Sequence, residues 1–353
     1  MAKLLEITGK AISGEWGQDD DTGTGIPVLR TTNFTNEGFV NYKNVVTRSI
    51  SKKNIAEKYL RHGDVIIEKS GGSDKQPVGR VIFFEGEENK YLFNNFTGLL
   101  RVQNPEEWLP KYVFYALYAY YRNGGTRAFE NRTTGLHNLQ VDNYVKSVDI
   151  PKLSYRKQQH ICETLDHVRD AVAYRERQLT KLDELIKARF VEMFGDPYTN
   201  SKDYPLKKGE SFFKLSNGKA VPESKRLNGG IPAYGGNGIS WYTDESLFDA
   251  DTIVVGRVGF QSGNVHLVKG PLWVTDNAMY MSSCDFSQYN LTFLIELMAH
   301  VDFTKFQDAG DLKKITQKPF MQFEYLCPPL SLQNQFTAFV AEVDKSKLLV
   351  GSA

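Results

Sequence analysis

A stretch near the middle of the sequence, Leu153–Met193, has the residue spacing of a coiled-coil helix. Apolar residues recur there at alternating intervals of four and three, an average of about 3.5 residues. No proline or glycine interrupts the stretch before Gly195, and Pro197 stands just beyond it. The apolar seam of this stretch consists of Ile161, Leu165, Val168, Val172, Leu179, Leu182 and Ile186. We therefore predict one helix of about 40 residues, on the order of 60 Å long, which separates two other parts of the chain.

The length and composition of the chain also indicate two domains. Its 353 residues are too many for one ordinary core, although a long core helix inside one large domain is the alternative interpretation of the seam. The three cysteines, Cys162, Cys284 and Cys327, are far apart and form no CxxC pair, which is typical of reduced cytoplasmic thiols and predicts no zinc site. The N-terminal residues show no secretory signal pattern, and no apolar run reaches the ~20 residues of a membrane helix. We expect a cytoplasmic protein.

The first part of the chain has the pattern of a mixed α/β domain. Short β-branched or apolar runs predict strands at 25–30, 64–67, 81–84 and 91–93. An apolar run that begins at Pro110 predicts a helix as far as Tyr121. The glycine-rich segment 69–79 and the segment 127–135 are expected to form loops.

The features of this first part recur in the same order after the long helix. Gly-Ile-Pro at 25–27 is matched at 230–232, and the strand and glycine-rich segment at 64–79 are matched at 251–259. The apolar helix is matched by Leu291–Val301. This order indicates an internal duplication.

The end of the chain has a second seam, which appears when Gln333 is aligned with Gln158. This seam consists of Phe336, Val340 and Val343. Only about 16 residues follow Leu330 before the non-periodic segment Lys347–Ala353, so we expect this distal helix to be short. The predicted fold is α/β (α+β), with two similar mixed domains separated by coiled-coil helices. Its parts are a first domain at 1–152, a spacer helix at 153–197, a second domain at 198–328 and the distal helix at 329–353.

Basic and amide side chains cluster in the loops of both predicted domains. Arginine and lysine suit phosphate and guanine, and asparagine and glutamine suit adenine. The net charge is only +1, so a nucleic-acid surface would have to come from such local clusters. The candidates in the first domain are Lys69, Ser70, Ser73, Lys75, Gln76, Arg127, Arg132, Thr133, Thr134 and His137. Those in the second are Lys219, Lys225, Arg226, Arg257, Gln261 and Asn264.

Sequence motifs for catalysis are missing. The chain has no GxxxxGK[ST], HExxH or GxSxG segment. Asn104-Pro105-Glu106 lacks the second proline and the aromatic residue of a methyltransferase motif, and the six histidines form no pair with metal-ligand spacing. We therefore expect a protein that binds, with no catalytic residue and no metal site.

These features together resemble the specificity (S) subunits of type I restriction–modification enzymes. The resemblance covers nearly the whole chain and depends on the order of Gly-Ile-Pro, Gly63–Ile67 with its glycine-rich sequel, 135–151, Gln158 and the heptad helix ending in 190–197. It implies that 1–152 and 198–328 are target recognition domains, which each read half of a bipartite double-stranded DNA sequence, with the helices as a spacer.

The resemblance also implies partners and cofactors. Two modification (methyltransferase) subunits would dock on the helix seams and bring S-adenosylmethionine, and restriction subunits would bring ATP and Mg, so this chain would bind no cofactor. Two other interpretations remain. One is the recognition subunit of a related type IIB or IIG restriction–methylation enzyme, and the other is a coiled-coil scaffold with two ligand-binding domains unrelated to DNA.

Overall fold

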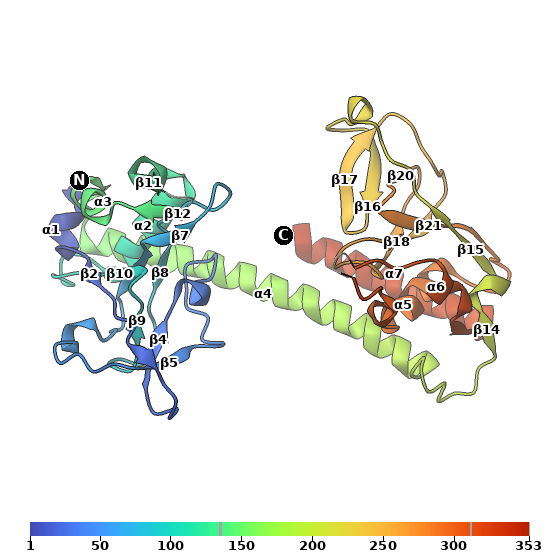
Figure 1. Cartoon of the computed structure of the whole chain (residues 1–353), viewed down its shortest axis with the longest axis horizontal. Coiled ribbons are helices and arrows are strands. Elements are labelled where there is room, and N and C mark those ends of the chain that lie inside the picture. The colour runs from blue at the N-terminus through green and yellow to red at the C-terminus, as the bar shows by residue number, and fades with distance from the viewer. Residues whose placement is uncertain (134–135, 311–312, 353) are drawn as a thin grey trace. The chain divides into compact units, whose positions relative to one another are not determined.

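The chain divides into two compact units, Met1–Ala171 and Val172–Ala353. The computed structural model describes residues 1–133, 136–310 and 313–352, and the side chains of 132, 133, 136 and 352 also lie outside this description. The division falls inside helix α4 (Tyr155–Phe194; Figure 1), so each unit includes part of this helix.

Helix α4 confirms the long helix predicted at Leu153–Met193. It spans 40 residues, as expected for a stretch without proline or glycine. Gly195 ends it with φ +77°, and its N–H donates to the Val191 carbonyl at 2.8 Å. Glycine adopts this left-handed conformation without the strain that a side chain would bring, which makes it a common residue just after a helix.

The first unit combines short strands with helix α2, which begins at Pro110 as predicted. The four-stranded sheet β2-β10-β6-β8 forms its centre, and the sheets β3-β5-β4-β9, β11-β12-β7 and β1-β13 surround it. The strands are β1 (Ala2–Lys3), β2 (Ile12–Ser13), β3 (Gln18–Asp19), β4 (Ile26–Leu29), β5 (Val46–Ser49), β6 (Val65–Glu68), β7 (Ser70–Gly72), β8 (Val81–Phe83), β9 (Leu92–Phe93), β10 (Thr97–Leu100), β11 (Glu130–Thr133), β12 (Leu136–Leu139) and β13 (Asp149–Ile150). The helices are α1 (Leu4–Thr8), α2 (Pro110–Arg122) and α3 (Val141–Ser147).

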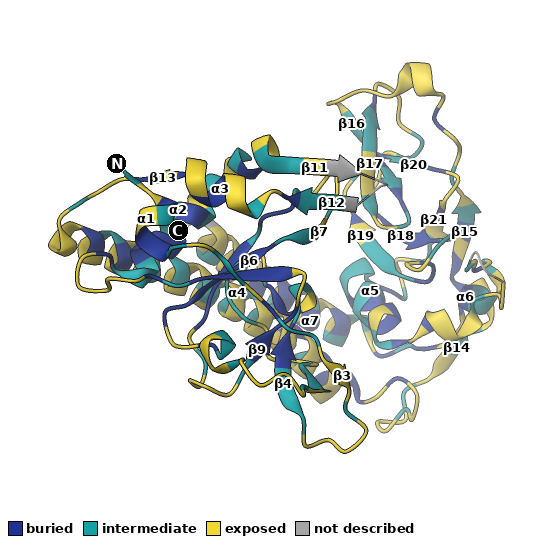
Figure 2. Ribbon diagram, turned by 60° about the vertical axis from the view of Figure 1, so that its left-hand side comes forward, coloured by how far each residue is buried: buried dark blue, intermediate teal, exposed yellow. Residues whose placement is uncertain are grey.

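Strand β6 is buried on both of its faces (Figure 2). Because side chains alternate along a strand, Val65 and Ile67 join the cluster that contains α2, while Ile66 joins a second cluster with β4 and β9. The two-sided burial explains why 64–67 reads as a continuous apolar run rather than an alternating one.

The second unit repeats this topology. Its sheet β15-β21-β18-β19 has the strand order of β2-β10-β6-β8, the pair β14-β22 corresponds to β1-β13, and β16 pairs in parallel with β20 as β4 does with β9. The strands are β14 (Leu206–Lys208), β15 (Phe213–Asn217), β16 (Ile231–Gly235), β17 (Gly238–Thr243), β18 (Thr252–Gly256), β19 (Val265–Val268), β20 (Trp273–Val274), β21 (Ala278–Cys284) and β22 (Glu324–Leu326), and the helices are α5 (Leu291–His300), α6 (Lys318–Gln322) and α7 (Leu330–Ser352). The predicted duplication is confirmed.

One buried glutamine in each unit ties the start of a long helix to the domain beside it. Gln158 on α4 accepts from the Leu109 N–H at 2.8 Å and donates to the Glu107 and Leu153 carbonyls at 2.9 and 3.0 Å. Gln333 on α7 accepts from the Asn290 N–H at 2.8 Å and donates to two carbonyls, those of Gln288 and Pro328, at 2.8 and 2.9 Å. The aligned glutamines therefore have the same role, and we call each arrangement a glutamine clasp.

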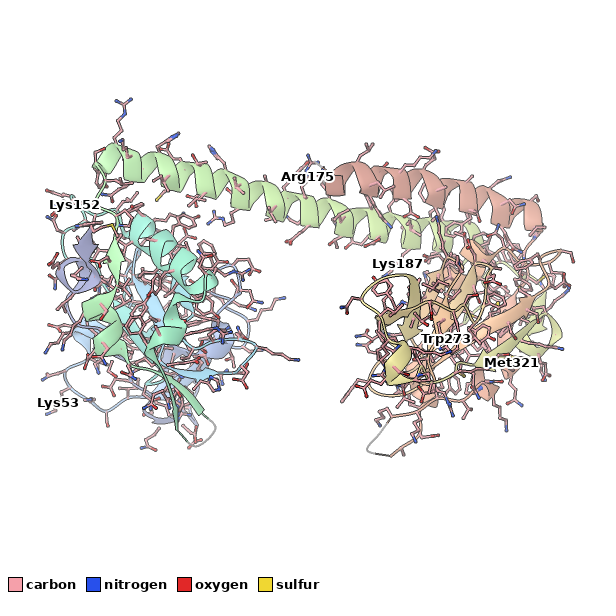
Figure 3. The ribbon with its side chains drawn as sticks, turned by 90° about the horizontal axis from the view of Figure 1, so that it is seen from above. Lys53, Lys152, Arg175, Lys187, Trp273 and Met321 are labelled. Carbon is pink, nitrogen blue, oxygen red and sulfur yellow. The ribbon has the colours of Figure 1, made fainter. Side chains whose placement is uncertain are left out.

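Helix α7 occupies most of the segment 329–353 predicted for the distal helix. It runs from Leu330 to Ser352, so the non-periodic segment that begins at Lys347 is helical as far as Ser352. The Lys347 ammonium lies 2.8 Å from Asp183 on α4, and this ion pair extends the contact between the two helices where the apolar seam has ended. The same ammonium lies 3.0 Å from Asp344 on its own helix. Figure 3 shows α7 running beside the part of α4 that carries Lys187.

A second difference concerns the segment expected to be a loop at 127–135. Residues 130–133 form β11, which pairs with β12 in an antiparallel hairpin. This hairpin has little apolar alternation because its residues are mostly polar, so its strands are specified by pairing rather than by a buried face.

A polar cluster joins α2 to α4 within the first unit. Asp166 accepts from the Tyr115 hydroxyl at 2.6 Å, and its other oxygen lies 2.9 Å from the Lys111 ammonium. Burial alone would raise the pKa of Asp166, but the hydrogen bonds from Tyr115 and Lys111 outweigh it and hold this pKa below its usual range. The charged form of Asp166 is therefore the one that stabilises the fold.

Because the pKa is lowered by folding, this stability is present above the unfolded pKa, near 4, and is lost as the pH falls through the folded value. Asp166→Asn is expected to destabilise the first unit at pH 7 by about 1–2 kcal/mol. When the pH is lowered to 3, the variant should lose less additional stability than the unaltered chain. Urea unfolding at pH 7 and pH 3, followed by hydrogen exchange in α2, measures both effects. Asp170→Asn, an exposed neighbour, is the control. An unchanged acid response in Asp166→Asn would contradict this assignment.

Candidate nucleic-acid interface

The first unit has a polar cleft of about 590 Å³ beside the C-terminal end of α2. Lys75 and Gln76 line it from the turn after β7, and Arg122 lines it from the last turn of α2. Arg127 and Asn123 also line the cleft, and the Arg127 guanidinium donates to the Asp74 carbonyl at 3.3 Å. The cleft therefore places cations and amides from three separate segments around one space.

Arg80 also lines this cleft, but its charge is already paired. Its guanidinium donates to both carboxylate oxygens of Glu68, at 3.0 Å each, and to the Thr31 carbonyl. Glu68 is buried, and a two-bond pair with arginine offsets the cost of burying its charge. Arg80 is thus a structural residue, and Lys75, Arg122 and Arg127 are the exposed cations of the cleft.

Of the candidates predicted in the first domain, the structure brings Lys75, Gln76 and Arg127 together. Lys69 lies elsewhere, donating to the Ser13 hydroxyl at 2.8 Å, and burial lowers its pKa. Ser73 closes the turn that carries Gln76, through hydrogen bonds of 2.7 and 3.1 Å between these two residues. Ser70 pairs with Asn138 in the sheet.

The remaining first-domain candidates are on the β11–β12 hairpin. His137 lies 3.2 Å from the Glu130 carboxylate and 3.9 Å from that of Asp74, so it is held inside the unit. The side chains of Arg132 and Thr133, and the whole of Thr134, lie outside the described residues.

The second unit gathers its candidates on the loop between β18 and β19. Arg257, Gln261 and Asn264 all belong to this loop, and Gln261 is exposed. The backbones of Lys313 and Lys314 pair with it through the Gly259 N–H to Lys313 carbonyl bond at 2.8 Å and the Val258–Lys314 bridge. The backbones of two acidic residues also contact this loop and its neighbours. The Arg257 guanidinium donates to the Asp276 carbonyl at 3.5 Å, and the Asp308 N–H donates to the Lys314 carbonyl at 2.8 Å. The surface is mixed polar rather than uniformly basic.

The other second-domain candidates lie around the β16–β17 hairpin. The Lys225 ammonium forms a 2.5 Å ion pair with Glu245. The Arg226 guanidinium stacks over the Trp241 ring at 4.1 Å, and the Lys219 carbonyl accepts from the Trp273 indole at 2.8 Å. The Arg226 guanidinium also donates to the Val221 carbonyl at 3.4 Å, and all three residues are exposed.

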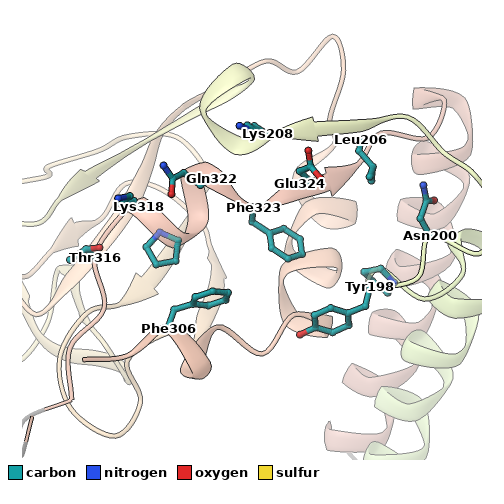
Figure 4. A pocket seen from close by; sticks show the side chains of 12 residues that line it. Tyr198, Asn200, Leu206, Lys208, Phe306, Thr316, Lys318, Gln322, Phe323 and Glu324 are labelled. Atoms are coloured by element: carbon teal, nitrogen blue, oxygen red, sulfur yellow. The ribbon is translucent and has the colours of Figure 1, made fainter. Parts of the chain in front are cut away.

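An apolar hollow of about 660 Å³ lies on the second unit, away from the predicted residues. Figure 4 shows Tyr198, Phe306 and Phe323 around it, with Lys208 and Glu324 at its border. It collects no group of titratable side chains suited to catalysis.

The predicted helix seam divides into exposed and buried positions. Leu165, Val168 and Val172 are exposed, while Ile161, Leu179 and Leu182 are half-buried. Ile186 belongs to the core of the second unit together with Phe336, Val340 and Val343. These last four side chains pack within the chain itself and offer no surface to another subunit.

Sequence reasoning missed Arg122 and Asn123 as cleft residues. In the sequence Arg122 is an ordinary basic residue at the C-terminal end of a helix, where a cation interacts favourably with the helix dipole. The position of Arg122 becomes part of the cleft only because the fold brings the turn at 75–77 close to it. Within the described residues no group of three His, Cys, Asp or Glu side chains could hold a metal ion, and no helix among them is long and apolar enough to cross a membrane.

The chain is related to known proteins in both sequence and fold. It is 23% identical over 120 residues to a Haemophilus influenzae protein named as a type I restriction enzyme specificity subunit, and 39% identical over 51 residues to the EcoprrI specificity subunit of Escherichia coli. These segments cover 33% and 14% of this chain and only 31% and 13% of the relatives. No family model matches the chain.

Solved structures resemble the chain over almost its whole length. The type I restriction–modification S subunit of M. genitalium matches with a TM-score of 0.60 and 15% identity, over 99% of this chain and 90% of that one. A structure from work on complex assembly and conformational transition of the type I R-M system matches with a TM-score of 0.52 and 13% identity over the same shares. The resemblance to the S subunits of type I restriction–modification enzymes that the sequence predicted is therefore confirmed in sequence and in fold.

Proposed function

We propose that this chain is the DNA specificity subunit of a type I restriction–modification system. The observation that carries the proposal is the repetition of a polar loop surface on two units of the same topology, each tied to a long helix by a glutamine clasp. A repeated surface suits a target made of two separate half-sites, because each unit can read one of them. The relationship to specificity subunits supports this function.

The chemistry of the two surfaces fits double-stranded DNA. Arg122 and Arg127 supply exposed guanidinium groups for phosphates or guanine, and Gln76 and Asn123 supply amides for adenine. On the second unit Arg257, Gln261 and Asn264 offer the same combination.

The chain itself would be non-catalytic and bind no cofactor. Modification subunits would provide S-adenosylmethionine, restriction subunits would provide ATP and Mg, and the complex would act in the cytoplasm.

Titration of the purified chain with random-sequence duplex DNA at 50 and 200 mM salt tests whether it binds DNA. Phosphate contacts release counterions, so the affinity should fall steeply with salt. In the Arg122→Ala/Arg127→Ala variant the salt slope should fall by about one for each arginine that contacts a phosphate. Fluorescence anisotropy measures both.

The matched control is Lys10→Ala/Lys53→Ala, which removes two exposed cations that do not line the cleft. It should leave the slope close to that of the unaltered chain. A chain that binds no duplex at either salt concentration would favour a coiled-coil scaffold unrelated to DNA. Equal losses in both double variants would show that the cleft has no special part in binding.

We also propose that the exposed part of the α4 seam docks a modification subunit. Leu165 and Val168 are 39% and 56% exposed and lie three residues apart, so they share one face of the helix. Amphipathic helices commonly dock through such apolar positions. Leu165→Asp/Val168→Asp is expected to leave the free chain folded, because both side chains already face solvent, and to abolish co-purification with the modification subunit. Burying two carboxylates in the contact would cost several kcal/mol.

His167→Asp is the control for this variant, since His167 is an exposed residue between these two positions on a different face of α4. It should co-purify normally. Normal complex formation by the Leu165/Val168 variant would place the docking surface elsewhere.

A further inference from the structure

Phe260 is the most exposed aromatic side chain among the residues that the structure describes. Its exposed fraction is 91%, compared with 59% for Phe286, also in the second unit. A single exposed apolar residue is ordinary on a protein surface. Phe260 differs because it stands at the tip of a loop that the fold holds in a fixed conformation.

Backbone hydrogen bonds fix this loop from both sides. Across its base, the Gly256 N–H donates to the Asn264 carbonyl at 2.9 Å and the Gly263 N–H to the Gly256 carbonyl at 2.8 Å. Nearer the tip, the Ser262 N–H donates to the Gly259 carbonyl at 3.0 Å, and Gly259 is itself tied to Lys313. The chain therefore holds a phenyl ring out into solvent on a supported tip, and little conformational freedom remains to be lost when the ring binds.

The neighbours of Phe260 are those of a DNA-binding surface. Arg257 and Gln261 belong to the same loop, and the backbone pairing described above places Lys313 and Lys314 beside it. An apolar ring among charged and amide side chains, with Asp276 and Asp308 also at this surface, does not suit the apolar centre of a protein–protein contact. It does suit the inside of a base stack, where the ring is buried while its neighbours contact phosphates and base edges.

We propose that Phe260 is a wedge that inserts between two adjacent base pairs of the half-site read by the second unit. This inference rests on the proposed DNA-binding function and specifies how one of the two surfaces engages its DNA. Apolar wedges partly unstack a base step and kink the duplex, and flexible pyrimidine–purine steps yield most easily. The corresponding segment of the first unit, 69–80, contains no aromatic residue. This loop therefore offers a wedge to one half of the target.

The test uses the complex assembled with its modification subunits, after methylome sequencing has identified the target. Duplexes carry 2-aminopurine, whose fluorescence rises on unstacking, at successive positions of both half-sites. The methyltransferase subunits flip the target base of each half-site out of the stack, which gives one bright position in each. We expect one further position, in a single half-site, to brighten on binding. Phe260→Ala should abolish that signal and weaken target binding by about 5- to 100-fold, the range for losing one base–aromatic contact. Phe260→Leu, which keeps an apolar wedge, should retain part of both effects.

Phe286→Ala removes an exposed phenylalanine outside the loop and should change neither measurement. Three outcomes separate the possibilities. Wild-type binding that is specific but brightens only the flipped target bases, or that is unaffected by Phe260→Ala, overturns the wedge and leaves the proposed function standing. Loss of modification-subunit assembly in Phe260→Ala overturns the wedge by assigning the residue to a protein contact. Failure of the wild-type complex to bind DNA specifically refutes the proposed function itself.

Discussion

Insertion of one heptad into α4 after Ala171 is expected to widen the unspecified gap in the DNA target by one to three base pairs. Seven residues are nearly two full turns, so the insertion keeps the seam almost in phase. It lengthens the helix by about 10 Å, and duplex DNA rises ~3.4 Å per base pair. The lower value applies if docked subunits restrain the extension. Both half-site sequences should stay unchanged, because neither loop surface is altered.

The position of this insertion follows from the structure. Leu182 and Ile186 pack on the core of the second unit, and Asp183 pairs with Lys347, so an insertion between Leu179 and Ile186 would disturb that unit. Ala171 is exposed and lies at the division between the two units. Replacing seven residues there, rather than adding seven, is the control and should keep the gap. Methylome sequencing gives the gap directly, and an active complex whose gap ignores the insertion would show that α4 does not set it.

Replacement of either clasp glutamine by leucine is expected to destabilise one unit by about 3 kcal/mol or more. Gln158 and Gln333 are 1% and 0% exposed, and each makes three hydrogen bonds to backbone groups. Leucine fills similar space but leaves one N–H and two carbonyls without their partner. Each buried polar group left unsatisfied costs ~1–3 kcal/mol.

Hydrogen exchange resolved by peptide distinguishes the two units within the full chain. Gln158→Leu should weaken protection in the first unit and Gln333→Leu in the second. Gln159→Leu and Gln335→Leu, at exposed neighbouring positions, are the controls. Protection that falls no further in the clasp variants than in these controls would show that the clasps contribute little.

The sequence predicted the parts of this fold that depend on hydrophobic pattern. The seam of α4, the buried run of β6 and the apolar helix α2 were all located to within a few residues, since each has a strong period or a continuous apolar run. The correspondence of Gln158 and Gln333 in the two repeats was also predicted, from the order of the elements along the chain. The sequence did not predict structure that depends on strand pairing between mostly polar residues, such as β11. Nor did it predict the ion pair between Lys347 and Asp183, which joins the last turns of α7 to α4.

The candidate site was harder to predict because exposure and pairing of side chains depend on distant segments. Lys69, Lys75 and His137 look alike as polar loop residues, yet Lys69 is partly buried against Ser13 and His137 lies between two carboxylates. Lys75 alone reaches the cleft, where Arg122 joins it from a helix end. The seam of α4 is a further example. Its heptad pattern does not distinguish the positions, yet the structure buries Ile186 and exposes Val168.

The pairing of β1 with β13, and of β14 with β22, has a consequence for synthesis on the ribosome. In each case the first strand of a unit pairs with its last, Ala2 with Ile150 and Leu206 with Leu326. Neither unit can therefore close until its final strand has emerged. At about 5–20 residues per second, the first unit can close on the order of ten seconds or more before the second. During that interval the nascent chain holds one finished core, so the two similar sheets have little opportunity to exchange strands.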